Sequence, residues 1–173
     1  MSLKNILCIG GNGALGKSVI KALSPHDIVN VDFSENPNAS SNLILDPSLT
    51  PQKNNLQVVK QIQKQKELFD AIIVTAGSWV GGSIEEENYL EKYDKMIAAN
   101  VMPCLLAGHL ACKYMNAQVG MNEQNGQKKQ EKPLLVFTGA AAVFKEPQPT
   151  MLAYSLAKTA AVSYTHLTLP TIC

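Results

Sequence analysis

The stretch Gly10-Gly11-Asn12-Gly13-Ala14-Leu15-Gly16 decides the fold of this chain, because it separates two patterns of opposite kind. An apolar run from Leu3 to Ile9 precedes it and predicts a buried strand. A helical pattern follows it, in which apolar residues recur on one face at Leu15, Val19 and Leu23. A strand, a glycine turn and a helix in this order form the context in which G-x-G-x-x-G indicates dinucleotide binding.

The glycines of this turn have separate expected roles. We predict that Gly11 takes the tight turn, that Gly13 lets the backbone approach a pyrophosphate, and that Gly16 allows the helix to pack closely on the strand. The free N–H groups and the partial positive charge at the helix N-terminus would hold the phosphates. We therefore expect the whole turn to bind the cofactor, through Gly11, Asn12, Gly13, Ala14, Leu15 and Gly16.

Composition narrows the class of protein. A chain of 173 residues predicts one domain, and a net charge of +1 gives no reason to expect nucleic acid or an acidic membrane surface as a partner. No stretch approaches the roughly 18 apolar residues of a membrane span, and the N-terminus lacks the long apolar segment of a signal peptide. The cysteines lack zinc-ligand spacing, so we predict no metal site, free thiols and a reducing compartment, the cytoplasm. The cysteines are Cys8, Cys104, Cys112 and Cys173.

Strand and helix patterns alternate along the chain and predict an α/β fold, a doubly wound and mostly parallel sheet of the Rossmann type. The expected strands cover residues 4–10, 27–32, 43–45, 70–76 and 133–139. The expected helices cover residues 14–24, 52–68, 86–116 and 150–163. Pro103 should divide the third of these helices near Asn100. Residues 116–132 predict a solvated loop, and residues 163–170 favour extended structure.

Asp32 ends the second expected strand, 21 positions after Gly11. An acid at this point accepts hydrogen bonds from the adenosine ribose and repels a 2′-phosphate. All 15 basic residues are lysine, so there is no arginine fork to neutralise such a phosphate. The sequence therefore predicts NADH in preference to NADPH. The alternative is an ordinary acidic residue at a strand end.

The loop after the fourth expected strand is a second candidate site. Thr75-Ala76-Gly77 should border the cofactor, because ligands of open α/β sheets bind beyond the carboxyl ends of the strands. Trp79 follows on a loop flanked by glycines. Its indole can stack on a flat heterocycle or close the loop against the core, and the sequence leaves both open.

Tyr154 and Lys158 stand one helical turn apart, on the same face of the last expected helix. The ammonium group favours the phenolate over the phenol, so the tyrosine can act as general acid toward a substrate being reduced. The Y-x-x-x-K spacing is common by chance. It becomes informative here because it follows the glycine turn, Asp32 and the 75–77 loop in order.

Together these motifs resemble the short-chain dehydrogenase/reductase family, over residues 4–162. The stretch Ala76-Gly77-Ser78-Trp79-Val80-Gly81-Gly82 is similar to that of the dihydropteridine reductases, since most of the family has Asn-Ala-Gly without the tryptophan. The resemblance implies reduction of a small-molecule pterin, a quinonoid dihydropterin, with hydride from NADH. It implies that Tyr154 supplies the proton, that Lys158 holds the nicotinamide ribose and that Trp79 lies against the pterin. It also implies a homodimer.

Two further positions bear on this resemblance. Ala141 stands where most of the family has a serine, and the dihydropteridine reductases similarly lack it. This favours them over carbonyl reductases that act on other substrates. Asn100 matches the family's helix asparagine, which helps to hold a proton-relay water.

The end of the chain departs from the family, which continues with further strands where residues 163–173 match nothing in it. We therefore expect residues 1–162 to form an NAD-binding domain that is incomplete relative to the family. We expect residues 163–173 to be an atypical tail that is not native family sequence. Two alternatives stay open: a carbonyl reductase with another substrate, and a catalytically silent NAD-binding fragment.

Overall fold

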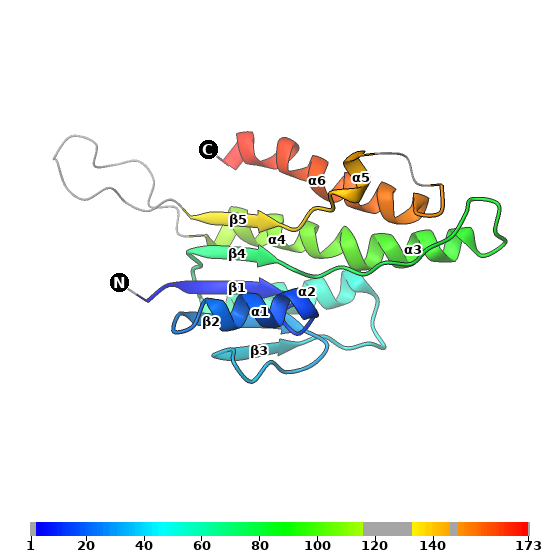
Figure 1. Cartoon of the computed structure of the whole chain (residues 1–173). Coiled ribbons are helices and arrows are strands. Elements are labelled where there is room, and N and C mark those ends of the chain that lie inside the picture. Colours follow the sequence, from blue (N-terminus) through cyan, green and yellow to red (C-terminus); the bar gives the residue numbers. More distant parts are fainter. Residues whose placement is uncertain (1–2, 116–132, 146–148, 173) are drawn as a thin grey trace.

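A computed structural model of the chain defines residues 3–115, 133–145 and 149–172. In this part of the chain five parallel strands form one sheet, in the order β3-β2-β1-β4-β5 (Figure 1). The strands are β1 (Asn5–Ile9), β2 (Asp27–Asp32), β3 (Ser41–Ile44), β4 (Ala71–Val74) and β5 (Leu134–Phe137). The predicted parallel α/β sheet is confirmed.

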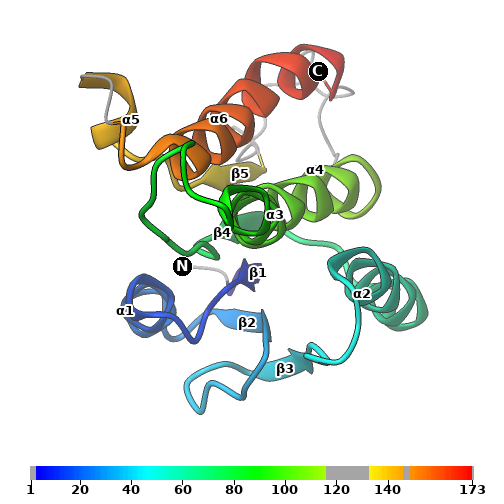
Figure 2. The same ribbon diagram turned by 90° about the vertical axis from the view of Figure 1, so that its right-hand side faces the viewer.

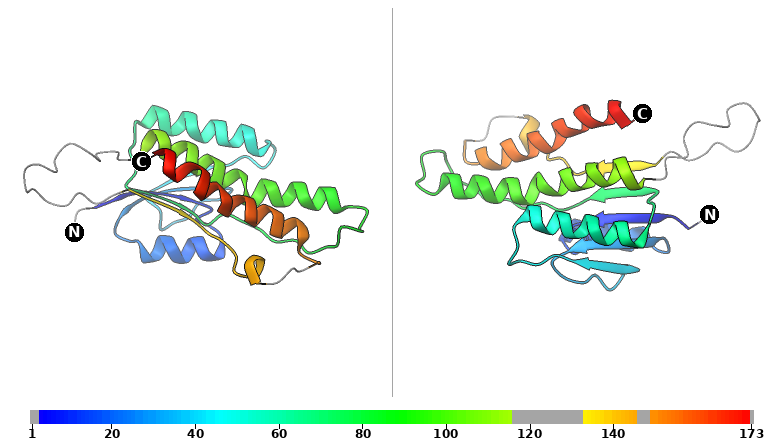
Figure 3. Two further views of the ribbon diagram at one scale, coloured as in Figure 1. Left: turned by 90° about the horizontal axis from the view of Figure 1, so that it is seen from above. Right: turned by 180° about the vertical axis from the view of Figure 1, so that it is seen from behind.

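Helices cover both faces of the sheet. They are α1 (Ala14–Ala22), α2 (Pro51–Gln65), α3 (Tyr89–Asn100), α4 (Met102–Tyr114), α5 (Ala142–Lys145) and α6 (Leu152–Ile172). Helix α1 lies on one face, and α2, α4 and α6 lie on the other (Figures 2 and 3). The short helix α5 had no counterpart among the predicted elements.

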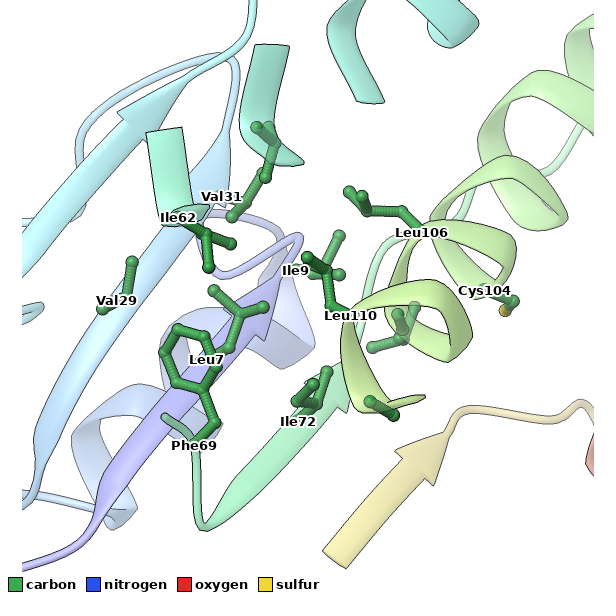
Figure 4. Close-up of a cluster of buried hydrophobic side chains, with 14 of the residues drawn as sticks. Leu7, Ile9, Val29, Val31, Ile62, Phe69, Ile72, Cys104, Leu106 and Leu110 are labelled. Carbon is green, nitrogen blue, oxygen red and sulfur yellow. The ribbon is translucent and has the colours of Figure 1, made fainter. Parts of the chain in front are cut away.

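The larger apolar core lies between the sheet and helices α2 and α4 (Figure 4). Because side chains alternate along a strand, Leu7 and Ile9 of β1 face this core, whereas Ile6 and Cys8 face the smaller core under α1. Both faces of β1 are therefore buried, as its continuous apolar sequence requires.

Helix α1 packs on the sheet through a different stripe from the one that its leucines indicated. Gly16 and Ile20 are its buried residues, and Ile20 joins the core under α1. Leu15 is 52% exposed. The glycine lets the helix backbone approach the turn, so the helix is rotated toward Gly16 and carries Leu15 away from the sheet.

The long helical stretch is divided as predicted, because α3 ends at Asn100 and α4 begins at Met102, next to Pro103. The expectation that no stretch is long and apolar enough to cross a membrane was wrong. The helical stretch Tyr89–Tyr114 meets that criterion by length and composition, because one window of 18 residues within it has a mean hydropathy of 1.3. Their apolar character has a structural cause in the fold, since α4 buries side chains against the sheet, among them Leu106 and Leu110.

The predicted extended structure of residues 163–170 was also wrong, because α6 continues to Ile172. A helix that is already nucleated extends at little cost per residue. Threonine and tyrosine lower helix propensity by less than about 0.7 kcal/mol each, and Pro170, which costs about 3 kcal/mol in a helix interior, stands within the last turn of α6. The loop predicted for residues 116–132 lies outside the described residues.

Candidate active site

The turn after β1 closes at Gly10, not at Gly11 as predicted. Gly10 has a φ of 89°, a left-handed conformation that favours glycine. A Cβ there would lie 2.3 Å from the backbone nitrogen of Ala76, because the loop after β4 passes directly beside the turn. This close approach of two loops is what selects glycine at position 10.

The other glycines of the turn divide into packed and open positions. A Cβ on Gly11 would lie 2.3 Å from Oδ1 of Asn30, and one on Gly16 would lie 2.2 Å from the Gly10 carbonyl oxygen. A Cβ on Gly13 would meet only that carbonyl oxygen, at 3.5 Å. Gly16 therefore lets α1 pack closely on the turn, at Gly10 and Gly11, and not on the strand as predicted. The backbone at Gly13, the N-cap of α1, faces open space where a phosphate can approach.

Asp32 lies beside the glycine turn and holds it. Its Oδ2 accepts a hydrogen bond of 2.8 Å from the backbone N–H of Asn12, and its Oδ1 accepts one of 2.7 Å from the N–H of Phe33. The side chain of Asn12 in turn donates to Ser34 Oγ. The carboxylate thus ties the end of β2 to the turn after β1.

A cleft of about 630 Å³ opens at the carboxyl ends of the strands, within the size range of small-molecule sites. Of the predicted cofactor residues, the cleft is lined by Asn12, Gly13, Asp32, Ala76 and Gly77. Gly11 and Gly16 are buried behind it, and Ala14 and Leu15 lie exposed on α1. Phe33 also lines the cleft, and sequence reasoning missed it although it follows Asp32 directly.

Thr75 joins the two loops that form the floor of the cleft. Its hydroxyl donates to the carbonyl oxygen of Gly10 at 2.9 Å. The backbone N–H groups of Thr75 and Ala76 both donate to the carbonyl oxygen of Ile9, at 2.8 and 2.9 Å. The glycine turn and the 75–77 loop are therefore one hydrogen-bonded unit.

Gly77 is the point at which the cleft meets two buried polar side chains. A Cβ there would lie 2.8 Å from Oδ1 of Asn100 and 3.1 Å from Nζ of Lys158. Asn100 donates from Nδ2 to the carbonyl oxygens of Ser78 and Met96, both at 3.0 Å. Its Oδ1 is buried and has no hydrogen-bond partner among the described residues. A buried acceptor in that state is suited to a ligand or an ordered water.

Lys158 is buried and donates from Nζ to the carbonyl oxygen of Thr138, at 3.2 Å. Burial lowers the pKa of this ammonium group below its usual 10.5, since the charged form loses hydration. The thiol of Cys104 lies near it and donates to the carbonyl oxygen of Asn100, at 3.3 Å. Burial raises the pKa of this thiol to about 11, so it stays protonated at neutral pH.

Tyr154 and Trp79 do not line the cleft, although the structure places both at the same end of it. The N–H of Gly82 donates to the carbonyl oxygen of Thr150 at 2.8 Å, which ties the loop that carries Trp79 to the start of α6. Tyr154 packs against a cluster around Met96. Trp79 is 60% exposed and its ring lies against Gly81, so the indole does not close the loop against the core.

No protein-family profile matches the chain. A dihydropteridine reductase of Dictyostelium discoideum is 30% identical over 159 residues, which cover 91% of this chain. A short chain dehydrogenase family protein of Francisella tularensis has a similar solved structure, with a TM-score of 0.75 at 23% identity over 99% of this chain. A 4-hydroxyisoleucine dehydrogenase, solved with NADH and succinate, gives a TM-score of 0.70 at 19% identity over 94% of this chain.

In sequence the chain is similar to a dihydropteridine reductase, and its fold is similar to that of the short-chain dehydrogenases. It spans 62% of the length of the Dictyostelium relative. It spans 66% and 70% of the two solved chains.

Some residues of this candidate site were not singled out from the sequence. Cys104 carries no motif, and only its place one helical turn after Asn100 could have indicated it. Ala141 is exposed and lies just before α5, so the family's serine position has no hydroxyl here.

Proposed function

We propose that this chain binds NADH and reduces a quinonoid dihydropterin to the tetrahydro form. The observation that carries the proposal is the cleft at the strand ends, which joins the open backbone at Gly13 and the carboxylate of Asp32 to the buried ammonium group of Lys158 behind Gly77. The sequence similarity to a dihydropteridine reductase supports the substrate class.

The residues present fit a nicotinamide dinucleotide. Gly13 leaves room for a pyrophosphate at the N-terminus of α1, and Asp32 is placed to accept ribose hydroxyl protons. When bound, the nicotinamide supplies a hydride. Lys158 would hold the nicotinamide ribose, and the unpartnered oxygen of Asn100 would hold a water or a ligand donor beside it.

Tyr154 would supply the proton to the reduced pterin. The phenol lies one turn before Lys158 on α6, next to the loop of Trp79. The exposed indole of Trp79 offers a flat apolar surface on which a pterin can stack. Because the pterin is already a strong hydride acceptor, the missing serine hydroxyl at Ala141 is tolerated.

Oxidation of NADH by the chain with quinonoid dihydropterin tests the proposal. Tyr154→Phe should lower kcat by about 10²–10⁴-fold and leave the affinity for NADH unchanged, since general acid catalysis contributes that much. Tyr93→Phe is the matched control, because Tyr93 packs against the same Met96 cluster from α3. Equal turnover by wild type and Tyr154→Phe would remove the proton-donor role.

The preference for NADH over NADPH follows from the carboxylate of Asp32. A 2′-phosphate on the adenosine ribose would lie against this negative charge, and the chain has no arginine to offset it. Asp32→Asn should narrow the ratio of the Kd values for NADPH and NADH. Equal affinity of the wild type for both cofactors would count against the proposal.

A second candidate function is NADH binding without turnover. Among the described residues, those that line the cleft fall between Ile9 and Leu106, so the pocket for the adenosine half of the cofactor needs neither Tyr154 nor Lys158. Binding of NADH that is unchanged in Tyr154→Phe, with no turnover before or after the change, would favour this candidate. A carbonyl reductase with another substrate is distinguished by its turnover of simple ketones.

We further propose a cytoplasmic location and a homodimer. The thiols of Cys8, Cys104 and Cys112 are free, which suits a reducing compartment. Fractionation of cells that express a tagged chain tests the location. Light scattering after size-exclusion chromatography tests the dimer, and a mass of one chain, 18.7 kDa, would contradict it.

A further inference from the structure

Three asparagines lie together beneath the glycine turn, outside the cleft. Asn30 of β2 and Asn42 of β3 are neighbours in register, and Nδ2 of Asn30 donates to Oδ1 of Asn42 at 2.8 Å. Asn30 is fully buried and alternates with Val29 and Val31, which face the larger core, so its side chain projects toward the α1 face. A polar pair is thus built into the sheet directly below the turn.

Asn36 completes the cluster from the connection between β2 and β3. This connection, residues 33–40, joins two parallel strands without a helix. Asn36 is fully buried, its N–H donates to Oδ1 of Asn42 at 2.9 Å, and its Oδ1 accepts from the N–H of Asn38 at 2.9 Å. Its Nδ2 donates to the carbonyl oxygen of Gly11 at 2.8 Å.

The peptide unit between Gly11 and Asn12 is therefore held at both of its polar ends. Its carbonyl oxygen accepts from Asn36, and its N–H donates to Asp32. A rotation of this peptide would break both bonds and leave two buried or half-buried polar groups without partners. Gly13, the open position at the N-terminus of α1, follows this peptide directly.

We propose that Asn36 is a positioning residue for nucleotide binding, which fixes the Gly11–Asn12 peptide and so presents the backbone at Gly13 to the pyrophosphate. This inference rests on the proposed binding of a dinucleotide. Asn36 does not line the cleft and acts through the turn. Replacement of Asn36 should therefore weaken the affinity for ligands that carry the phosphates and leave the affinity for adenosine nearly unchanged.

Two variants of Asn36 and one control test the inference. Asn36→Asp keeps the shape and the acceptor for Asn38 but replaces the donor to Gly11 with a second oxygen. Asn36→Ala removes the side chain without adding a buried charge, and serves if the aspartate variant does not fold. Asn38→Asp is the matched control, because it makes the same substitution on the same loop at an exposed position.

The first measurement needs no nucleotide. Hydrogen exchange is followed by NMR on the free protein. The amide of Asn12 should exchange about tenfold faster in both Asn36 variants than in wild type, since the peptide unit between Gly11 and Asn12 loses its hydrogen bond from Asn36. In Asn38→Asp its exchange should be unchanged. Amides of β1, such as that of Leu7, should keep their protection. Unchanged exchange at Asn12 would show that Asn36 does not hold the Gly11–Asn12 peptide, whatever the nucleotide data show, and would overturn the proposal.

The second measurement compares ADP with adenosine by calorimetry. The Asn36 variants should lose about tenfold in affinity for ADP and less than about threefold for adenosine. A purely structural loosening of the loop would weaken both ligands equally, and that result would overturn the positioning role. If the wild-type chain binds neither NADH nor ADP, the proposed function fails and the positioning role fails with it. The exchange data still decide whether Asn36 holds the Gly11–Asn12 peptide.

Discussion

Gly16→Ala tests whether helix α1 is held against the turn by backbone contact. The added Cβ would lie 2.2 Å from the carbonyl oxygen of Gly10 and 2.6 Å from Cα of Gly11. Real Cβ atoms essentially never lie closer than 3.0 Å to another heavy atom. Since the Cβ would lie 2.2 Å from the Gly10 oxygen, the helix and the turn must separate by at least 0.8 Å. Because the opposing atoms are backbone, no side-chain rotation can relieve the contact. The displacement also moves Ile20, the fully buried anchor of α1.

The cost follows from two opposing terms. Overpacking of this kind costs about 1–3 kcal/mol, and we take the upper end because the contact is with backbone. Alanine returns about 1 kcal/mol through its higher helix propensity. We therefore expect the free energy of unfolding to fall by about 2 kcal/mol. For a chain of this length the Tm should fall by about 4–8 °C.

Urea unfolding followed by circular dichroism measures the loss. Gly13→Ala is the control, because its Cβ would meet only the Gly10 oxygen at 3.5 Å and its φ of −68° suits alanine. It should lower the free energy of unfolding by at most about 1 kcal/mol, since alanine is a poorer N-cap than glycine, and it should weaken the affinity for NADH because the methyl group occupies the phosphate approach. A wild-type midpoint for Gly16→Ala, or an equal loss in both variants, would refute the packing argument.

Three further predictions concern stability. Burial lowers the pKa of Lys158 in the folded protein below its usual 10.5. Between the folded-state pKa and 10.5 the unfolded chain therefore binds more protons than the folded protein, and the free energy of unfolding rises with pH. Lys158→Met should remove this rise in urea midpoints measured from pH 7 to 10.5, and an unchanged slope would contradict it. Burial raises the pKa of Cys104 from 9.0 to about 11, so stability falls as pH rises through this range; Cys104→Ala should flatten the fall. The side chain of Thr50 caps α2 by accepting from the N–H of Lys53 at 3.3 Å. Thr50→Ala should cost about 1 kcal/mol in urea unfolding, and Thr50→Ser should restore most of it.

The positions of the strands and helices along the sequence were predictable because each pattern is local. An apolar run, a glycine turn and an amphipathic stretch follow one another along the sequence, and Pro103 marks the division of the long helix. The phase of α1 was harder to predict. Leu15, Val19 and Leu23 have helical spacing, and so do Gly16, Ile20 and Leu23. A glycine carries no hydrophobic signal, so the pattern favoured the wrong stripe.

Long-range contacts explain most of the remaining errors. The turn closes at Gly10 because Ala76, far along the chain, passes within 2.3 Å of the Cβ position. No motif in the sequence singles out Asn36, yet the short connection from β2 to β3 folds it under the turn, where it is fully buried. The convergence of Asn100 and Lys158 on Gly77 likewise depends on the packing of α3 against α6. No local sequence pattern predicts these long-range contacts.

The lining of the cleft between Ile9 and Leu106 has a consequence for the order of assembly during synthesis on the ribosome. Every described residue that lines the cleft has been translated before the polypeptide reaches β5. The lysine that meets Gly77 emerges much later, on the last helix. Under the proposed function, a growing polypeptide would therefore contain the lining of the cofactor cleft while Tyr154 and Lys158 are still being made, and the cofactor would be able to bind before the chain is finished.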